Sequence, residues 1–218
     1  MRLRLRSASP RCAGRDRASR SLAEPLASLV SVLCFVAALG CVGTVVEQPY
    51  PALAERREPI RKVAVAPIAA RPEEAAAAAP LVSRHLAEAL ATRGIEVVAP
   101  EDVGHLDTGA GVPELAAAVA KQFGVDAVLV GEITRWVERE GEALGSQRPA
   151  AVGIRVTLHG APAGERLWQG EFDRTQQPLL ENVLLTPRYP GGGTRWLSAD
   201  EFARFAADEL ATAMPVAK

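Results

Sequence analysis

The feature that most constrains the fold of this 218-residue chain is an unbroken apolar run, AVLV at 127–130. A strand without polar alternation is expected where both faces of a sheet are covered, as in the parallel part of an α/β protein. Two more strand-like stretches precede it, at 62–68 and 95–98, and helix-like segments separate the three. This order predicts two βαβ crossovers, which are right-handed in nearly all sheets, with helices packed on one sheet.

Both connecting helices have recognisable ends. The first is expected over 72–93, with acidic residues in its first turn, Gly94 as its stop and Pro80 as a point where it kinks or splits. Residues 99–111 read as a loop, and the second helix is expected over 112–124, with a proline near its start and a glycine at its end.

The second half of the folded region changes pattern. The third strand is expected over 126–140, and two further strands, at 152–159 and 166–172, are joined by GAPAGE as a hairpin. Ser198 followed three residues later by a glutamate is a capping box, so a helix should begin there. The fold class we predict is α/β, a single mixed β-sheet built as βαβαβ plus an antiparallel hairpin and a C-terminal helix.

The N-terminal region has the pattern of a targeting segment rather than of part of the folded domain. Residues 1–41 carry seven arginines against two acids, and an uncharged, mostly apolar run of about fifteen residues follows them. Such a run is too short for a comfortable spanning helix and suits a secretory signal peptide. The remaining 42–218 hold 18 basic and 24 acidic residues, a formal net charge of −6, which argues against nucleic-acid binding by phosphate neutralisation.

The end of the apolar run, AALGC at 37–41, resembles the lipobox of bacterial lipoproteins. That resemblance implies that Cys41 is lipidated and becomes the first residue after cleavage, and that Val42 after it favours the outer membrane. The domain boundaries we predict are a lipoprotein signal peptide at 1–40, the lipidated cysteine with a flexible tether at 41–61, and a periplasmic α/β domain at 62–218. The other two cysteines lie before Cys41, so no disulfide or zinc site is expected after it.

Two longer phrases carry a second resemblance. LVSRHLAEALATRGIEVVAPEDV and AKQFGVDAVLVGEIT, after the VAVAPI strand, resemble a broad superfamily of envelope lipoproteins. It includes the curli-secretion channel lipoprotein, the lipoprotein activators of penicillin-binding proteins and the N-terminal domain of the Tol-system propeller protein. The resemblance covers about 62–172 and implies a non-enzymatic binding or scaffold role in envelope assembly, secretion or cell-wall synthase regulation, with a membrane anchor and another envelope protein as partners. It leaves the partner and the oligomeric state open.

The residues offer little for chemistry. The three histidines, His85, His105 and His159, have no second ligand at metal spacing, and no nucleophile motif is present. The triple glycine at 191–193 lacks the lysine and the helix junction of a phosphate loop. We therefore expect no catalytic, metal or cofactor site. The alternative is an envelope hydrolase or polysaccharide-processing enzyme, which predicts an acid and a base converging in a pocket.

A segment of 22 residues, 175–196, is too long for a simple connection between the last strand and the last helix. Arginine and aromatic side chains are typical of protein-binding hot spots, and the segment ends with four of them: Arg188, Tyr189, Arg195 and Trp196. These four are the candidate partner-binding residues. The alternatives are that Trp196 closes the core beneath the last helix, or that part of the segment packs across the domain as a strap.

Overall fold

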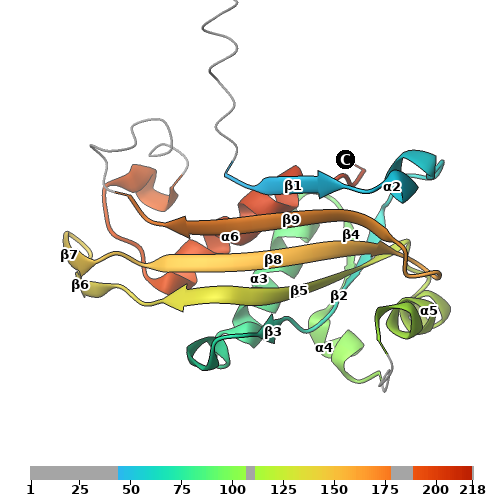
Figure 1. Ribbon diagram of the computed structural model, residues 1–218, viewed down its shortest axis with the longest axis horizontal. Coiled ribbons are helices and arrows are strands. Elements are labelled where there is room, and N and C mark those ends of the chain that lie inside the picture. Colours follow the sequence, from blue (N-terminus) through green and yellow to red (C-terminus); the bar gives the residue numbers. More distant parts are fainter. Residues whose placement is uncertain (1–43, 107–110, 178–188, 218) are drawn as a thin grey trace, which may run out of the picture. The chain divides into compact units, whose positions relative to one another are not determined.

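The apolar run at 127–130 opens β5, the strand at the centre of a seven-stranded mixed sheet (Figure 1). The structure, a computed structural model, describes residues 44–106, 111–177 and 189–217. The strand order is β1-β9-β8-β5-β2-β4, with β3 also paired to β5. The predicted α/β class is confirmed, because parallel and antiparallel strands share one sheet and helices pack on it.

The sheet contains β1 (Val46–Pro49), β2 (Lys62–Val65), β3 (Ala69–Ala70), β4 (Glu96–Val98), β5 (Ala127–Val137), β8 (Ala151–Gly160) and β9 (Arg166–Thr175). A separate hairpin consists of β6 (Glu140–Glu142) and β7 (Gly145–Arg148). The helices are α2 (Pro51–Glu55), α3 (Ala79–Thr92), α4 (Pro100–Gly104), α5 (Val112–Phe123) and α6 (Ala199–Ala213), with 3-10 turns η1 (Glu73–Ala75) and η3 (Pro190–Gly193).

The parallel half consists of β4, β2 and β5. The crossover from β2 to β4 runs toward the sheet edge, and the crossover from β4 to β5 runs back in the opposite direction, past β2. Because both crossovers are expected to be right-handed, this reversal of direction places their helices on opposite faces of the sheet. Side chains of α3 belong to one buried cluster and those of α4 and α5 to another. Within β5, Leu129 packs in the first cluster and Val128 in the second, which explains why the run has no polar alternation.

The antiparallel half extends the sheet through β8 and β9, which pair with β5 and with each other. Here one face is covered by α6, which packs beside α3, and the strands alternate accordingly. Val152, Ile154, Val156 and Leu158 are fully buried in the cluster beneath α6. The intervening Arg155 points to the other face, where it bonds Glu132 of β5 and Glu171 of β9.

The capping box predicted for the last helix is confirmed. The N-cap Ser198 accepts from the amide of Glu201, and the carboxylate of Glu201 accepts from the amide of Ser198. The residue before the cap, Leu197, and the fourth helical residue, Phe202, are both fully buried in the main cluster. They occupy the two positions of a hydrophobic staple. The alternative in which Trp196 closes the core beneath this helix is therefore wrong, because Leu197 occupies that position.

The expected tether over 41–61 is the largest correction in the described part of the chain. Val46–Pro49 form β1, which pairs antiparallel with β9, and α2 follows it. Further on, Asp126 accepts from the amides of Arg61 and Lys62 at 2.8 and 2.9 Å. Within the described residues, the folded unit thus already includes β1, well before Lys62. A short edge strand that ends in proline has no period to signal it, and its partner lies more than 100 residues away.

The break predicted at Pro80 is confirmed: the helix expected over 72–93 is divided into η1 and α3, because proline is tolerated in a first helical turn and not in an interior. Two other boundaries differ from expectation. The loop expected at 99–111 contains α4, which has Pro100 in its first turn. The strand expected over 126–140 ends at Val137, and the chain then forms the β6–β7 hairpin, for which no prediction was made.

The signal peptide expected at 1–40 and the lipidated Cys41 lie outside the described residues. Within 44–106, 111–177 and 189–217, no helix is both long and apolar enough to cross a bilayer.

Candidate functional site

The candidate residues after the triple glycine divide into a core residue and a surface set. Tyr189 is only 5% exposed. Its ring meets those of Phe202 and Phe205 edge-on, with centroids 5.9 and 5.1 Å apart. Burial raises the pKa of the Tyr189 phenol above its ordinary value, as expected for a group surrounded by rings. In this position Tyr189 packs α6 against the sheet and offers no surface to a partner.

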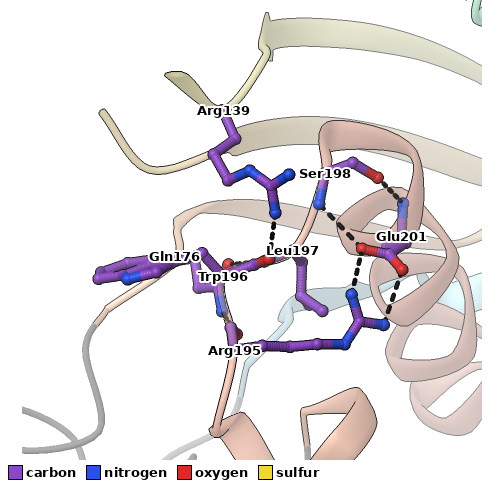
Figure 2. Close-up of polar contacts among 7 residues, drawn as sticks. All are labelled: Arg139, Gln176, Arg195, Trp196, Leu197, Ser198 and Glu201. Atoms are coloured by element: carbon purple, nitrogen blue, oxygen red, sulfur yellow. Dashed lines mark hydrogen bonds and ion pairs between the residues drawn. The ribbon is translucent and has the colours of Figure 1, made fainter. Parts of the chain in front are cut away.

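Arg195 is part of the helix cap. Its two terminal nitrogens bond the two carboxylate oxygens of Glu201 at 2.8 and 2.7 Å, in a forked arrangement (Figure 2). The Arg195 guanidinium, helped by the Ser198 amide, lowers the pKa of Glu201. The Arg195 side chain is 39% exposed, but its guanidinium is already ion-paired with Glu201 of the capping box.

The backbone around Trp196 is held from two sides. The side chain of Gln176, itself 2% exposed, donates to the carbonyl of Arg195 at 2.9 Å and accepts from the amide of Leu197 at 2.7 Å. Arg139 donates to the carbonyl of Trp196 (Figure 2). The chain therefore follows a fixed path at this point, whereas the leucines and valine of the strap alternative, at 179–184, lie outside the described residues.

A further bond ties this path to the β6–β7 hairpin. The amide of Trp196 donates to the carbonyl of Ala143 at 2.8 Å, next to the hairpin tip. The following residue at the tip, Leu144, is 88% exposed, and it lines a small hollow of about 130 Å³ together with Trp196. The indole of Trp196 points away from α6 in Figure 2. We call these two side chains the Leu144–Trp196 patch.

The remaining candidate, Arg188, lies outside the described residues. Of the four candidates, the structure thus assigns one to the core and one to a cap, and leaves one side chain, that of Trp196, partly exposed beside an apolar neighbour. Sequence reasoning missed Leu144, because EGEALGSQR at 140–148 carries no strand period and reads as the polar end of a longer strand.

The histidines have separate environments. His85 on α3 bonds Asp200 on α6 at 2.9 Å, and the ring of His159 bonds the carbonyl of Gly164 at 2.9 Å. His105 is exposed and lines a cavity of about 450 Å³ together with Glu101. Among the described residues, no group of three histidine, cysteine or acidic side chains could hold a metal ion.

The open face of the antiparallel half carries a row of ion pairs. Arg155 bonds Glu132 and Glu171 on the neighbouring strands, both at 3.1 Å, and Glu132 also bonds Arg71 at 2.6 Å. Opposite charges directly across strands stabilise the pairing of those strands. Because these charges satisfy each other, this face is a solvated sheet surface, with less to offer a partner than the apolar patch.

No protein-family model matches the sequence, and a search of curated proteins finds no match. Among solved structures, the PelC dodecamer from Paraburkholderia phytofirmans matches with a TM-score of 0.50 and 18% identity, over 80% of this chain and 98% of that one. Lipoprotein GNA1162 from Neisseria meningitidis matches with a TM-score of 0.41 and 19% identity, over 57% and 91% of the two chains. The LpoB C-terminal domain from Escherichia coli matches with a TM-score of 0.38 and 19% identity, over 58% and 94%.

At 18% identity, the match to PelC shows a similar fold and nothing about activity. The matches to GNA1162 and LpoB are more distant, and we draw no conclusion from them.

Proposed function

We propose that this chain is a lipid-anchored, non-enzymatic protein of the bacterial cell envelope that docks another envelope protein through the Leu144–Trp196 patch. Two features of the sequence support the envelope: a lipobox-like AALGC that ends in Cys41, and the resemblance of 62–172 to envelope lipoproteins. Lipidation of Cys41 would place the domain at a membrane, in our proposal the inner leaflet of the outer membrane, facing the periplasm.

The observation that carries the docking proposal is the exposure of Leu144 next to a fixed tryptophan. An isolated exposed leucine is common on protein surfaces. Leu144 differs because it stands at a hairpin tip that is hydrogen-bonded to Trp196, whose backbone is held on both sides. A rigid aromatic anchor with an apolar neighbour loses little entropy when it binds, which is the usual character of a hot spot.

The occupant we propose is an apolar pocket on another envelope protein. Two ion pairs lie near the patch, Arg195 with Glu201 and Arg148 of β7 with Glu140 of β6, while the exposed Glu142 forms no ion pair among the described residues. Paired charges at the rim would neither attract nor repel a charged partner strongly, so the two apolar side chains would dominate affinity. PelC forms a dodecamer, so a second copy of this chain is the alternative occupant to be distinguished.

Site-specific photocrosslinking tests the docking proposal. A photoreactive residue at position 144 should give a discrete adduct in intact envelopes, and the Trp196→Ala variant should reduce its yield severalfold. The same residue at the exposed Thr92 on α3 is the matched control, and it should not give that adduct. Mass spectrometry of the adduct separates a partner protein from a second copy. Equal labelling from both positions, or labelling from position 144 that is indifferent to Trp196, would contradict docking through the patch.

The anchor is tested separately. Replacing Cys41 by serine should release the protein from membranes, and globomycin should block processing of the wild type. Membrane association that survives the Cys41→Ser change would refute the lipid anchor while leaving the docking test unaffected.

A further inference from the structure

A second surface feature lies where the two crossovers diverge. From β2 the chain passes to α3 on one face of the sheet, and from the neighbouring β4 it passes to α4 and α5 on the other. The carboxyl ends of two adjacent parallel strands whose connections leave in opposite directions form a crevice, and ligands of open α/β sheets bind there. The cavity of about 450 Å³ occupies this place, since its walls come from the segments after β2 and after β4.

The cavity walls are apolar and held in place. Three prolines contribute to them, namely Pro67, Pro80 and Pro100. The loop after β2 is fastened to α3 by Ser83, whose hydroxyl accepts from the amide of Ile68 at 2.9 Å and donates to a carbonyl of α3 at 2.8 Å. Because proline has a fixed φ and Ser83 is bonded twice, these walls need little ordering when a ligand enters.

The polar groups of the cavity come mainly from α4 and from His105, the residue that follows it. Glu101 and His105 are four residues apart, so they lie on the same side of this helical turn, and both line the cavity. Within the described part of the chain, Glu101 forms no ion pair, unlike the carboxylates of the open sheet face. A neutral imidazole adds one acceptor nitrogen. The cavity thus combines an apolar interior with one uncompensated negative charge and a second acceptor.

We propose that this cavity binds a small amphipathic amine, with its apolar body between the prolines and its ammonium group at Glu101. The volume lies within the range of about 300–1,000 Å³ that is usual for small-molecule sites. An ammonium group can donate to both a carboxylate and an imidazole nitrogen, whereas a carboxylate ligand would be repelled by Glu101. This site is independent of the Leu144–Trp196 patch, because the two share no residue.

The chain offers a sparse probe for this site. It has five isoleucines, Ile60, Ile68, Ile95, Ile133 and Ile154, and of these Ile68 lines the cavity. The full chain, labelled at the isoleucine δ1 methyl groups and held in lipid nanodiscs, is titrated with three aromatic probes that differ in charge: phenethylamine, phenethyl alcohol and 3-phenylpropionate. Ring currents should shift the Ile68 methyl signal, and the other four signals serve as internal controls.

We expect phenethylamine to bind most tightly, the alcohol about three- to tenfold more weakly, and the carboxylate not measurably. The modest ratio follows from the exposure of Glu101, since exposed ionic contacts contribute little. Glu101→Gln should remove the preference for the amine, and Asp102→Asn, the next residue along α4, should preserve it. Ala79→Phe should fill the cavity and abolish the Ile68 shift for both the amine and the alcohol, whereas Ala77→Phe, outside the lining, should not.

Three results would overturn the proposal. If none of the probes shifts Ile68 at millimolar concentration, or if the shift persists in Ala79→Phe, the cavity is not the binding site. If the alcohol and the amine bind equally well to the wild type, the site is apolar and Glu101 does not select a cation. Unchanged positions of the other four methyl signals in each variant would establish that the fold is retained.

Discussion

Replacing Tyr189 and Trp196 separately by alanine distinguishes packing from docking at the end of the 175–196 segment. The sequence predicts both residues to belong to one partner-binding surface, and the structure gives them different surroundings. Tyr189 is 5% exposed and contacts two phenylalanine rings of α6, whereas Trp196 is partly buried and is held through its backbone.

The two substitutions should differ in cost. Removing a buried aromatic ring costs about 3–5 kcal/mol, because the ring's transfer energy is lost and a cavity remains. We expect Tyr189→Ala to cost about 3 kcal/mol, which corresponds to a fall in the melting temperature of about 6–12 °C in a domain of this size. Trp196→Ala leaves two backbone hydrogen bonds in place: the one from the amide of residue 196 to the carbonyl of Ala143, and the one from Arg139 to the carbonyl of residue 196. It should cost about 1 kcal/mol.

Thermal and urea unfolding of the full chain, followed by far-ultraviolet circular dichroism, measure these differences without relying on tryptophan fluorescence. The photocrosslinking yield at position 144 is then measured for both variants under conditions in which each is folded. We expect Tyr189→Ala to lower the free energy of unfolding without reducing the yield of the adduct. Trp196→Ala should reduce the yield of the adduct with little change in the free energy of unfolding.

Either of two outcomes would refute this reasoning. A loss below about 1 kcal/mol for Tyr189→Ala would mean that its ring does not pack in the core. A loss for Trp196→Ala as large as that for Tyr189→Ala would mean that Trp196 is a core residue, and the patch would no longer be a candidate docking surface.

The cap and the first strand give two more predictions. Because Arg195 lowers the pKa of Glu201 below its ordinary 4.5, the stabilisation from Glu201 is complete above that value and is lost as the pH falls through the folded pKa. The stability difference between wild type and Glu201→Gln, measured as urea midpoints, should be below about 1 kcal/mol at pH 6, since the side chain is 36% exposed, and should shrink as the pH is lowered below 4.5. A difference that does not change with pH would contradict this. Glu47 of β1 accepts from the buried indole of Trp168, so Glu47→Ala should cost about 1 kcal/mol in urea unfolding. Glu55→Ala on the exposed α2 should cost almost nothing, and equal effects would mean that β1 is not part of the fold.

What the sequence predicts well here are features set by neighbouring residues. The double-sided burial of β5 follows from AVLV itself, and the capping box of α6 needs only Ser198 and Glu201, three positions apart. The glycine that ends α5, Gly124, has a φ of 63°, which glycine adopts readily. Each of these signals is local, so no knowledge of the rest of the fold is required.

The features that the sequence did not predict depend on distant partners. Residues 46–49, VEQP, form a strand because the edge of β9 is free to pair with them, and these four residues contain no pattern that predicts a strand. Tyr189 and Trp196 are seven residues apart and both aromatic, yet the first meets Phe202 and Phe205 while the second meets a hairpin tip. Burial of an aromatic side chain outside regular structure is decided by which elements lie opposite, and sequence spacing carries no such information.

The early start of the folded unit changes how a lipidated Cys41 would act. Thr44 is only 5% exposed, and its hydroxyl forms a hydrogen bond with Glu209 of α6, so only two residues separate this fixed position from Cys41. The three Cα–Cα steps from Cys41 to Thr44 span at most about 11 Å, less than the radius of gyration of about 15 Å expected for a domain of this length. If Cys41 is lipidated as proposed, a domain on so short a connection would stay close to the membrane, and a partner would have to reach it at the membrane surface. In exchange, confinement raises the local concentration of the Leu144–Trp196 patch for any partner held on the same membrane. The proposed docking and the proposed anchor are thus physically linked: lengthening the connection would weaken the first without altering any contact in the patch.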